Sequence, residues 1–192
     1  IRDSDDEALF FNPVDRSTYF VAGISNNTLS YQVFDHASRS LTNNQTLTSN
    51  LSDIGQFTPL GATWDRCRAT AYLFGEHRKN RQDTWVVVAF DPNQQQFKIV
   101  TEEQQKEIPY QNRNFLDTKP KHSWHPTDDQ WQIEYAKRGN LSTKRALAFI
   151  GAYNARTQAL ELTNSTPAVG TAMAVSYDMQ SMRITGGGNE SY

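Results

Sequence analysis

The chain has 192 residues, of which 37% are hydrophobic and 21% charged, and its formal net charge at pH 7 is −2. This length is enough for a single domain with a sizeable core. The small net charge gives no reason to expect a nucleic acid or an anionic membrane as a partner. We expect no membrane span, because no stretch approaches the 18 or so apolar residues that one requires.

Six asparagines stand in N-x-S/T patterns, which is more than this composition would give by chance. They are Asn26, Asn44, Asn50, Asn140, Asn164 and Asn189. Surface asparagines in such patterns carry glycans in proteins that pass through a eukaryotic secretory pathway. The chain also begins at Ile1 rather than Met, as expected if a leader has been removed. These features predict a secreted, extracellular glycoprotein, and the alternative is a cytosolic protein with loops rich in Ser, Thr and Asn.

Cys67 is the single cysteine of the chain, so no internal disulfide is possible. A domain of this size can fold without one. We expect Cys67 to be a small buried residue beside the start of a strand. The alternative is an intermolecular bridge or a reactive thiol.

The first third of the chain predicts short strands separated by turns and polar connections. Residues 1–7 carry four acidic side chains and predict a disordered N-terminus, and residues 8–192 predict a single all-β domain. The strands expected here are Ala8–Phe11, Thr18–Ile24 and Leu29–Phe34. Residues 37–52 predict a weak edge strand with a loop, and residues 53–65 predict a connection.

The centre of the chain predicts three consecutive strands, which are Arg68–Phe74, Thr84–Phe90 and Phe97–Val100. The connections between them are short, and parallel crossovers need a dozen or more residues, so these strands must be antiparallel neighbours. Residues 101–129 then predict a long polar loop, a length that often carries function. Further strands are expected at Trp131–Ala136, Arg145–Tyr153, Ala159–Leu162, Thr171–Tyr177 and Met182–Thr185, and no helix is predicted.

An aromatic residue followed by Asp or Asn recurs at the ends of four predicted strands. The pairs are Phe34-Asp35, Phe90-Asp91, Tyr153-Asn154 and Tyr177-Asp178. The Asp or Asn side chain starts a turn by accepting hydrogen bonds from downstream amides. In three of these units an apolar strand ends in a glycine, at Gly23, Gly75 and Gly151. Asp35 and Asp91 are 56 residues apart, and a repeat of this length built only from strands is typical of a propeller blade.

The segments TYFVAGISNNTLSYQVFDHASRSL and AYLFGEHRKNRQDTWVVVAFDPNQQQF resemble repeats of the Kelch family of β-propellers. The resemblance implies an antiparallel, propeller-like fold with about three to four units, as a whole or as part of a larger propeller. The family's Gly-Gly pair is intact only at Gly186-Gly187, and the closing Trp is absent. The alternative fold is a β-sandwich.

Two histidines, His122 and His125, are the only clustered pair in the sequence. A metal site would need a third ligand, which the sequence does not specify. Asp128 and Asp129 stand nearby, but adjacent aspartates before a strand are ordinary turn residues. We therefore predict a solvated histidine pair, no metal site and no cofactor.

Six residues at predicted strand ends or in loops are the candidate ligand-binding residues: Trp64, Arg66, Glu76, Arg78, Trp124 and Asp128. Aromatic faces stack on the apolar face of a sugar, while neighbouring polar groups bind its hydroxyls. In the alternative interpretation Trp85 and Trp131 belong to the core and the other aromatic residues only cover loops.

The sequence favours a secreted, glycosylated recognition protein without catalytic residues, which binds a glycan or a protein through its strand-end loops. One alternative is a secreted carbohydrate-active hydrolase or oxidase that uses the loop of residues 101–129. Another is a structural subunit of a larger assembly, as an oligomer or with a completing chain. Loops that gather at one face of a propeller or sandwich offer a broad surface, but a fold does not determine a function.

Overall fold

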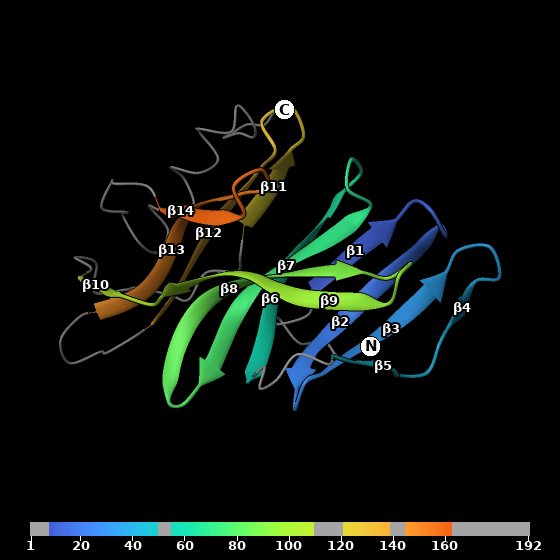
Figure 1. Ribbon diagram of the computed structural model, residues 1–192, viewed down its shortest axis with the longest axis horizontal. Coiled ribbons are helices and arrows are strands. Elements are labelled where there is room, and N and C mark those ends of the chain that lie inside the picture. Colours follow the sequence, from blue (N-terminus) through green and yellow to red (C-terminus); the bar gives the residue numbers. More distant parts are fainter. Residues whose placement is uncertain (1–7, 50–54, 110–120, 139–144, 163–192) are drawn as a thin grey trace. The chain divides into compact units, whose positions relative to one another are not determined.

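A computed structural model describes residues 8–49, 55–109, 121–138 and 145–162 of the chain, and these residues form only strands and turns (Figure 1). The predicted all-β, antiparallel class is thereby confirmed for the described residues, and none of their ranges contains a helix able to cross a membrane. The strands are β1 (Ala8–Asn12), β2 (Ser17–Ser25), β3 (Thr28–Asp35), β4 (Ser40–Leu41), β5 (Gln45–Thr48), β6 (Gln56–Asp65), β7 (Thr70–Lys79), β8 (Gln82–Asp91), β9 (Gln96–Gln104), β10 (Glu107–Pro109), β11 (Lys121–His125), β12 (Gln130–Arg138), β13 (Arg145–Asn154) and β14 (Ala159–Leu162).

The strands form three meanders in which each strand pairs with the next one along the chain. The first contains β1, β2 and β3 with β4 and β5 as a divided fourth strand, and the second contains β6 to β9. A pairing of Ile24 with Phe57 joins these two meanders into one nine-stranded sheet. The third meander, β11 to β14, forms a five-stranded sheet together with β10, which pairs with β13.

The chain divides into two compact units, and both are discontinuous in sequence. The first unit contains residues 1–104, 123–131 and 153–160, and the second contains residues 105–122, 132–152 and 161–192. The predicted disordered N-terminus, residues 1–7, lies outside the described residues. The prediction of one domain over residues 8–192 stays a prediction.

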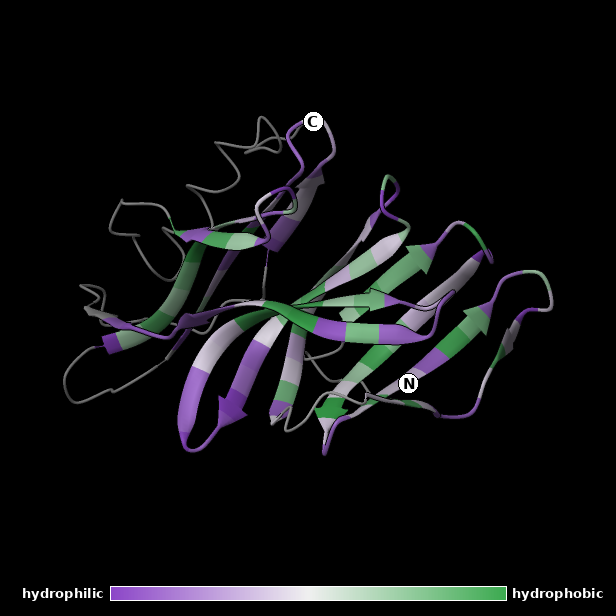
Figure 2. Cartoon of the chain, in the orientation of Figure 1, coloured by the Kyte–Doolittle hydropathy of each residue, from purple (hydrophilic) through white to green (hydrophobic). Residues whose placement is uncertain are grey.

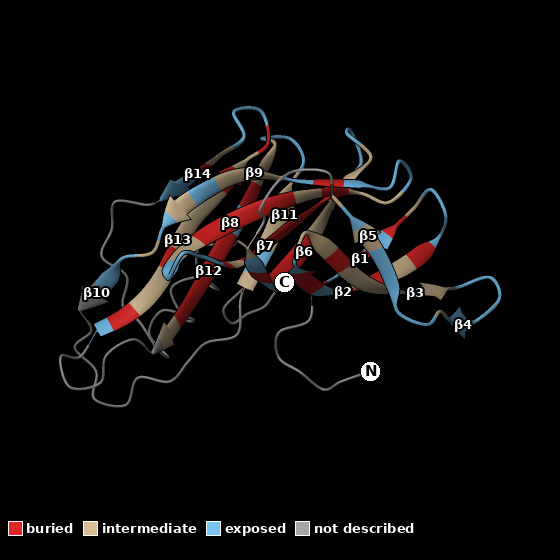
Figure 3. Ribbon diagram, turned by 60° about the horizontal axis from the view of Figure 1, so that its bottom comes forward, coloured by how far each residue is buried: buried red, intermediate tan, exposed pale blue. Residues whose placement is uncertain are grey.

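The core of the first unit lies on both faces of β7, the strand around which the other elements pack (Figure 3). Side chains of a strand alternate between its two faces. Ala71 and Leu73 therefore share one face, where they belong to a cluster with Phe10, Val21 and Phe90. The aromatic rings of Phe10 and Phe90 meet edge to face there, with centroids 5.9 Å apart.

The other face of β7 carries Tyr72 and Phe74, which pack against aromatic residues from later parts of the first unit. The ring of Tyr153 lies 4.9 Å from that of Tyr72, and the ring of Trp131 lies 6.5 Å from that of Phe74. Trp131 and Tyr153 have no exposed surface. Residues more than 50 positions apart in the sequence therefore complete this half of the core.

Six hairpins share one turn design, in which four residues connect the strands and the last has a left-handed backbone. Those last residues are Arg16, Arg39, Ala69, Gln95, Asp129 and Gln158, with φ between 49° and 61°. In five of the six turns, an Asn or Asp side chain at the strand end accepts the amide two residues later. The predicted turn role is thus confirmed for Asp35, Asp91 and Asn154, while Asp178 lies outside the described residues.

Gly75 allows β6 and β7 to approach more closely than a side chain would permit. A β-carbon at Gly75 would lie 2.1 Å from the carbonyl oxygen of Thr58, beside the register shift between Pro59 and Gly61. Gly23 has φ +142° at the corresponding place in β2, a conformation that other residues rarely adopt. Gly151 lies in the third strand of its meander instead of the second, so its predicted equivalence with these glycines is wrong.

Three predictions for individual segments are wrong. Residues 53–65 were expected to be a connection, but most of them form the ten-residue strand β6. The expected loop of residues 101–129 contains the end of β9 together with β10 and β11. Cys67 is exposed in the turn between β6 and β7, because it follows the turn-forming Asp65 by two residues. The predicted strands Thr171–Tyr177 and Met182–Thr185 lie outside the described residues.

Candidate ligand-binding pocket

A polar cavity of about 210 Å³ lies at the end of the second meander, close to the turn between β7 and β8. Figure 2 shows that this hairpin changes from apolar at its centre to hydrophilic at its tip. The residues that line the cavity are Gln56, Thr58, Glu76, His77, Arg78 and Asp83. The strand register explains their meeting, because Arg78 pairs with Gln56 on one side and with Asp83 on the other.

Arg78 and Asp83 form the best-defined contact of the pocket. The guanidinium Nε donates to Oδ1 of Asp83 over 2.7 Å, and Nη2 donates to Oδ2 over 2.8 Å. This two-point contact raises the pKa of Arg78, and the negative charge of Glu76 adds to the effect. A planar guanidinium held at two points has a fixed orientation, so its remaining N–H groups point in defined directions.

Glu76 on β7 and Thr58 on β6 form a second cross-strand pair, beside the pair of Arg78 and Gln56. Trp85, the partner of Glu76 on β8, is 1% exposed and stacks on Phe74. Polar groups from three strands therefore surround the cavity, next to a buried aromatic pair. The backbone of those strands fixes the spacing of the polar groups, because each belongs to a paired residue.

The imidazole of His77 faces away from the row of Glu76 and Arg78, because alternate residues of a strand point to opposite faces. Its Nδ1 lies 2.7 Å from Oε1 of Glu102, which also accepts a hydrogen bond from the hydroxyl of Thr84 over 3.1 Å. With an ionised Glu102, which only accepts, Nδ1 is the donor of this hydrogen bond. His77 is 2% exposed, and its Nε2 has no partner among the described residues. His77 therefore connects β7 to β9 at one wall of the pocket.

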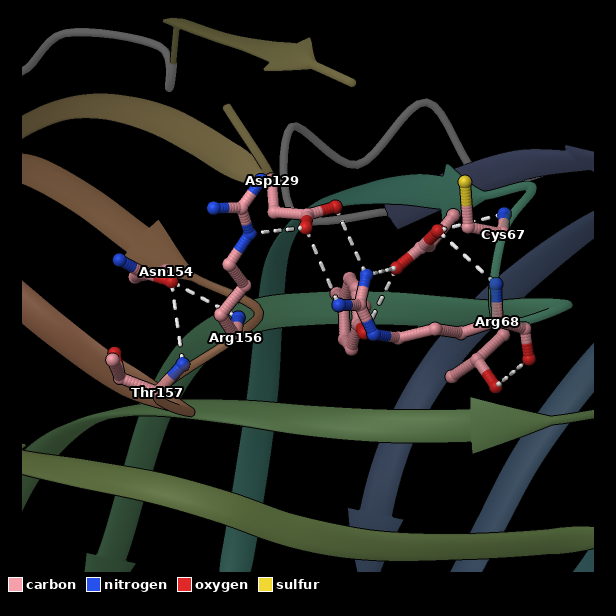
Figure 4. A network of polar contacts seen from close by, with 9 residues as sticks. Cys67, Arg68, Asp129, Asn154, Arg156 and Thr157 are labelled. Atoms are coloured by element: carbon pink, nitrogen blue, oxygen red, sulfur yellow. Dashed lines mark hydrogen bonds and ion pairs between the residues drawn. The ribbon is translucent and has the colours of Figure 1, made fainter. Parts of the chain in front are cut away.

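The opposite end of β7 carries a second group of polar side chains, which we call the turn cluster: Asp65, Arg68, Tyr72, Asp129 and Arg156 (Figure 4). Asp65 has no exposed surface and accepts hydrogen bonds from Arg68 Nη1 over 2.8 Å and from the Tyr72 hydroxyl over 3.1 Å. Arg68 also binds Asp129 over 3.0 Å, and Asp129 accepts from Arg156 Nε over 2.8 Å. The cluster thus joins three four-residue turns.

Electrostatics in the turn cluster follow from these contacts. Arg68 and then Arg156 stabilise the charged form of Asp129 and lower its pKa to about 2. Burial raises the pKa of Tyr72, and it raises that of Tyr153 to about 12. The two arginines of the cluster form ion pairs with its two aspartates, and these pairs hold the turns together.

The structure divides the six predicted binding residues between the two ends of β7. Only Glu76 and Arg78 line the pocket. Arg66 and Asp128 are exposed in the turns that the turn cluster joins. Trp64 and Trp124 belong to the same end.

The two predicted tryptophans are half-buried and pack against aromatic rings of the first unit. The Trp64 ring stacks 5.9 Å from that of Phe10, and the Trp124 ring lies 6.0 Å from that of Tyr72. Trp85 and Trp131 are fully buried, so the interpretation that places them in the core is confirmed.

Sequence reasoning missed four residues of the pocket lining: Gln56, Thr58, His77 and Asp83. The first two lie in the segment interpreted as a connection because of its glycines and proline. The alternation of polar and apolar residues in QFTP, residues 56–59, was the available signal for a strand. Asp83 lies just before the predicted start of a strand and faces the pocket because its cross-strand neighbour is Arg78.

The two clustered histidines lie on strand β11, three positions apart. Residues separated by three positions in a strand point to opposite faces, so His122 and His125 are poorly placed to share an ion. Within the described ranges, no group of three or more His, Cys, Asp or Glu side chains could hold a metal ion.

Comparisons of the chain with protein-family models, curated proteins and solved structures found no match.

Proposed function

We propose that this protein is a secreted, glycosylated recognition protein that binds a sugar ring in the pocket formed by β6, β7 and β8. One observation supports the proposal most strongly. Polar side chains of three paired strands surround a single cavity, and one of them, Arg78, is held by two hydrogen bonds to Asp83. A few polar groups in fixed positions are what a site for a small polar ligand requires.

The chemistry of the pocket suits a compact ligand with several hydroxyl groups. The Glu76 carboxylate accepts hydrogen bonds from hydroxyls, Arg78 donates to their oxygens, and the Gln56 amide does both. The volume of about 210 Å³ lies below the range of about 300–1,000 Å³ that drug-sized ligands occupy. A single sugar ring therefore fits this site better than an extended peptide does.

Binding without catalysis is favoured by the pairing of Asp83. Glycosidases use two carboxyl groups, one of which must carry a proton as the general acid. Both oxygens of Asp83 accept hydrogen bonds from Arg78, which favours the ionised form. Glu76 is the other carboxyl group of the pocket lining, and hydrolysis would require both. The arrangement therefore suits recognition better than hydrolysis.

Titration of sugars into the purified protein, followed by calorimetry, tests the proposal. We expect saturable binding of one sugar class, at least a roughly tenfold loss of affinity in Arg78→Met and Glu76→Gln, and no change on addition of EDTA. The matched control is Arg66→Met, because Arg66 is an exposed arginine at the other end of β7.

Unchanged affinity in both pocket variants would place the site elsewhere. No binding to any sugar, with capture of a defined protein instead, would replace the sugar by a protein ligand. Release of product sugar during the titration would mean that the protein is a hydrolase.

We further propose that the three meanders are blade-like units of a Kelch-type propeller, with a β-sandwich as the alternative. The first two use the same turns in the same order, including a two-residue turn with both residues left-handed, at Asn26-Asn27 and Asn80-Arg81. A crystal structure of the whole chain distinguishes the two. Blades around a central axis would support the propeller, and two face-to-face sheets would support the sandwich.

A role in assembly is the second candidate function. Leu9, Phe11 and Val14 are 55%, 48% and 65% exposed on β1 and the turn after it. Exposed apolar side chains that lie close together often mark an interface. Light scattering that gives twice the chain mass, and a return to the chain mass in Phe11→Ser, would support this function. A monomer at all concentrations would exclude self-association through this surface.

A further inference from the structure

One edge of the nine-stranded sheet carries no charged side chain. The strands β4 and β5 form this edge, and both pair with β3 on their inner side. No strand of the described residues pairs with their outer side. Residues 40–49, with the sequence SLTNNQTLTS, contain no Asp, Glu, Lys, Arg or Pro. Figure 3 shows that these strands are largely exposed.

Such an edge is a hazard in solution, because its free N–H and C=O groups can pair with a strand of another molecule. Proteins usually block open edges with charged side chains, proline or bulges. The opposite edge of the same sheet follows this rule, since β9 carries Lys98, Glu102 and Glu103. The edge formed by β4 and β5 is interrupted at residues 42–44, but it carries no charged side chain or proline and is rich in threonine, a residue that favours strands.

Asn44 lies in this edge, at the interruption between β4 and β5, and is exposed. The N-x-S/T pattern that begins at Asn44 includes Gln45 and Thr46, which are also exposed. Thr42 fixes the interruption, because its amide donates to the carbonyl of Val33 and its hydroxyl accepts from the Val33 amide. The edge is therefore held in place, with Asn44 exposed at its interruption.

We propose that Asn44 carries an N-linked glycan and that this glycan protects the uncharged edge from pairing with other chains. A glycan is bulky and hydrated, so it blocks the approach of a second strand as a charged side chain does elsewhere. This inference rests on passage through the secretory pathway, which is part of the proposed function. It does not depend on the sugar pocket.

Asn26 provides an internal comparison. It also stands in an N-x-S/T pattern and is exposed, but it lies at the tip of the hairpin between β2 and β3. A glycan there extends from a hairpin tip, whereas Asn44 lies between the two strands of the open edge. Loss of a glycan from Asn26 should therefore leave association between chains unchanged.

The test compares variants of the full chain secreted from eukaryotic cells. Mass spectrometry of glycopeptides should find a glycan on Asn44. Asn44→Gln and Thr46→Ala should both associate on the order of tenfold faster than the parent in light scattering, whereas Asn26→Gln should not. Thr46→Lys also lacks the glycosylation pattern but introduces a charge on the edge, so it should stay as dispersed as the parent.

Each alternative result has a distinct meaning. A glycan on Asn26 with an unmodified Asn44 would overturn the inference and leave the secretory origin intact. A chain without any glycan would overturn both. A glycosylated Asn44 whose loss leaves association unchanged, or aggregation of Thr46→Lys as fast as that of Thr46→Ala, would remove the protective role.

Discussion

At the scale of single residues, Asp65 is a buried carboxylate that holds several donors of its turn in place. Its carboxylate has no exposed surface and accepts hydrogen bonds from Arg68, Tyr72 and two turn amides. Removal of the carboxylate leaves these donors without their acceptor. We expect Asp65→Ala to lower the free energy of unfolding by about 3 kcal/mol. Urea unfolding measures this loss, and Asp91→Ala, in an exposed turn of the same design, should cost only about 1 kcal/mol. Equal losses would contradict the special role of Asp65.

Asp129 makes stability depend on pH in the acid range. Its pKa is about 2 in the folded protein, below the ordinary value of 3.8. A lowered carboxyl pKa contributes stability above the unfolded pKa, and this contribution is lost as the pH falls from about 4 to about 2. Urea midpoints measured at pH 5 and pH 2.5 should therefore differ more in the parent than in Asp129→Asn. The same difference in both proteins would contradict the ion pairs with Arg68 and Arg156.

His125 occupies the place that Asn or Asp takes in the other five turns of the four-residue design. Its turn lacks the side-chain acceptor for the following amides, and its backbone carbonyl accepts the Asp128 amide over a long 3.3 Å. His125→Asp should therefore raise the free energy of unfolding by about 0.5–1 kcal/mol, despite the loss of the contact between His125 and Ser123. Urea unfolding at pH 7 measures the change. A less stable variant would show that the contact with Ser123 contributes more than the turn.

At the scale of the elements, the close approach of β6 and β7 depends on Gly75. A β-carbon there would meet the Thr58 carbonyl at 2.1 Å, and backbone atoms cannot rotate away as a flexible side chain does. We expect Gly75→Ala to separate the strands, to cost about 3 kcal/mol or more, and to weaken ligand binding in the adjacent pocket. Ala22→Ser, on the exposed face of β2, is the control. Normal stability of Gly75→Ala would contradict this packing.

The strands were largely predictable from the sequence, whereas the pocket was not. Alternation identified β3, and runs of apolar, aromatic or β-branched residues identified β2, β7 and β8. The segment before Asp65 was missed because its glycines and proline suggested a connection, although Pro59 and Gly61 lie at a register shift inside β6. The pocket depends on which residues of different strands face each other, and that register is not visible in one strand alone. Glu76 and Arg78 were named, but their partners Gln56, Thr58 and Asp83 were not.

At the scale of the whole molecule, the first unit is complete only with segments from the second half of the chain. Trp124, Trp131 and Tyr153 cover Tyr72 and Phe74. A fragment that ends at Gln104 should therefore expose this face of β7, bind a hydrophobic dye and unfold without a cooperative transition. Dye fluorescence and thermal denaturation measure both properties. A cooperative, dye-free fragment would show that the first two meanders are stable by themselves.

Because the first unit contains segments from distant parts of the sequence, the ribosome makes some of its residues well after the others. The ribosome adds roughly 5–20 residues per second, so β7 leaves it several seconds before Tyr153 exists. Throughout that interval Tyr72 lacks the ring of Tyr153 that packs on it in the folded protein. It lies in a nascent chain that also displays the uncharged edge of β4 and β5. A chaperone that binds exposed apolar surfaces could bind this face of β7 during synthesis. The vulnerable period for this protein therefore comes during translation, before the last turns of the turn cluster can close.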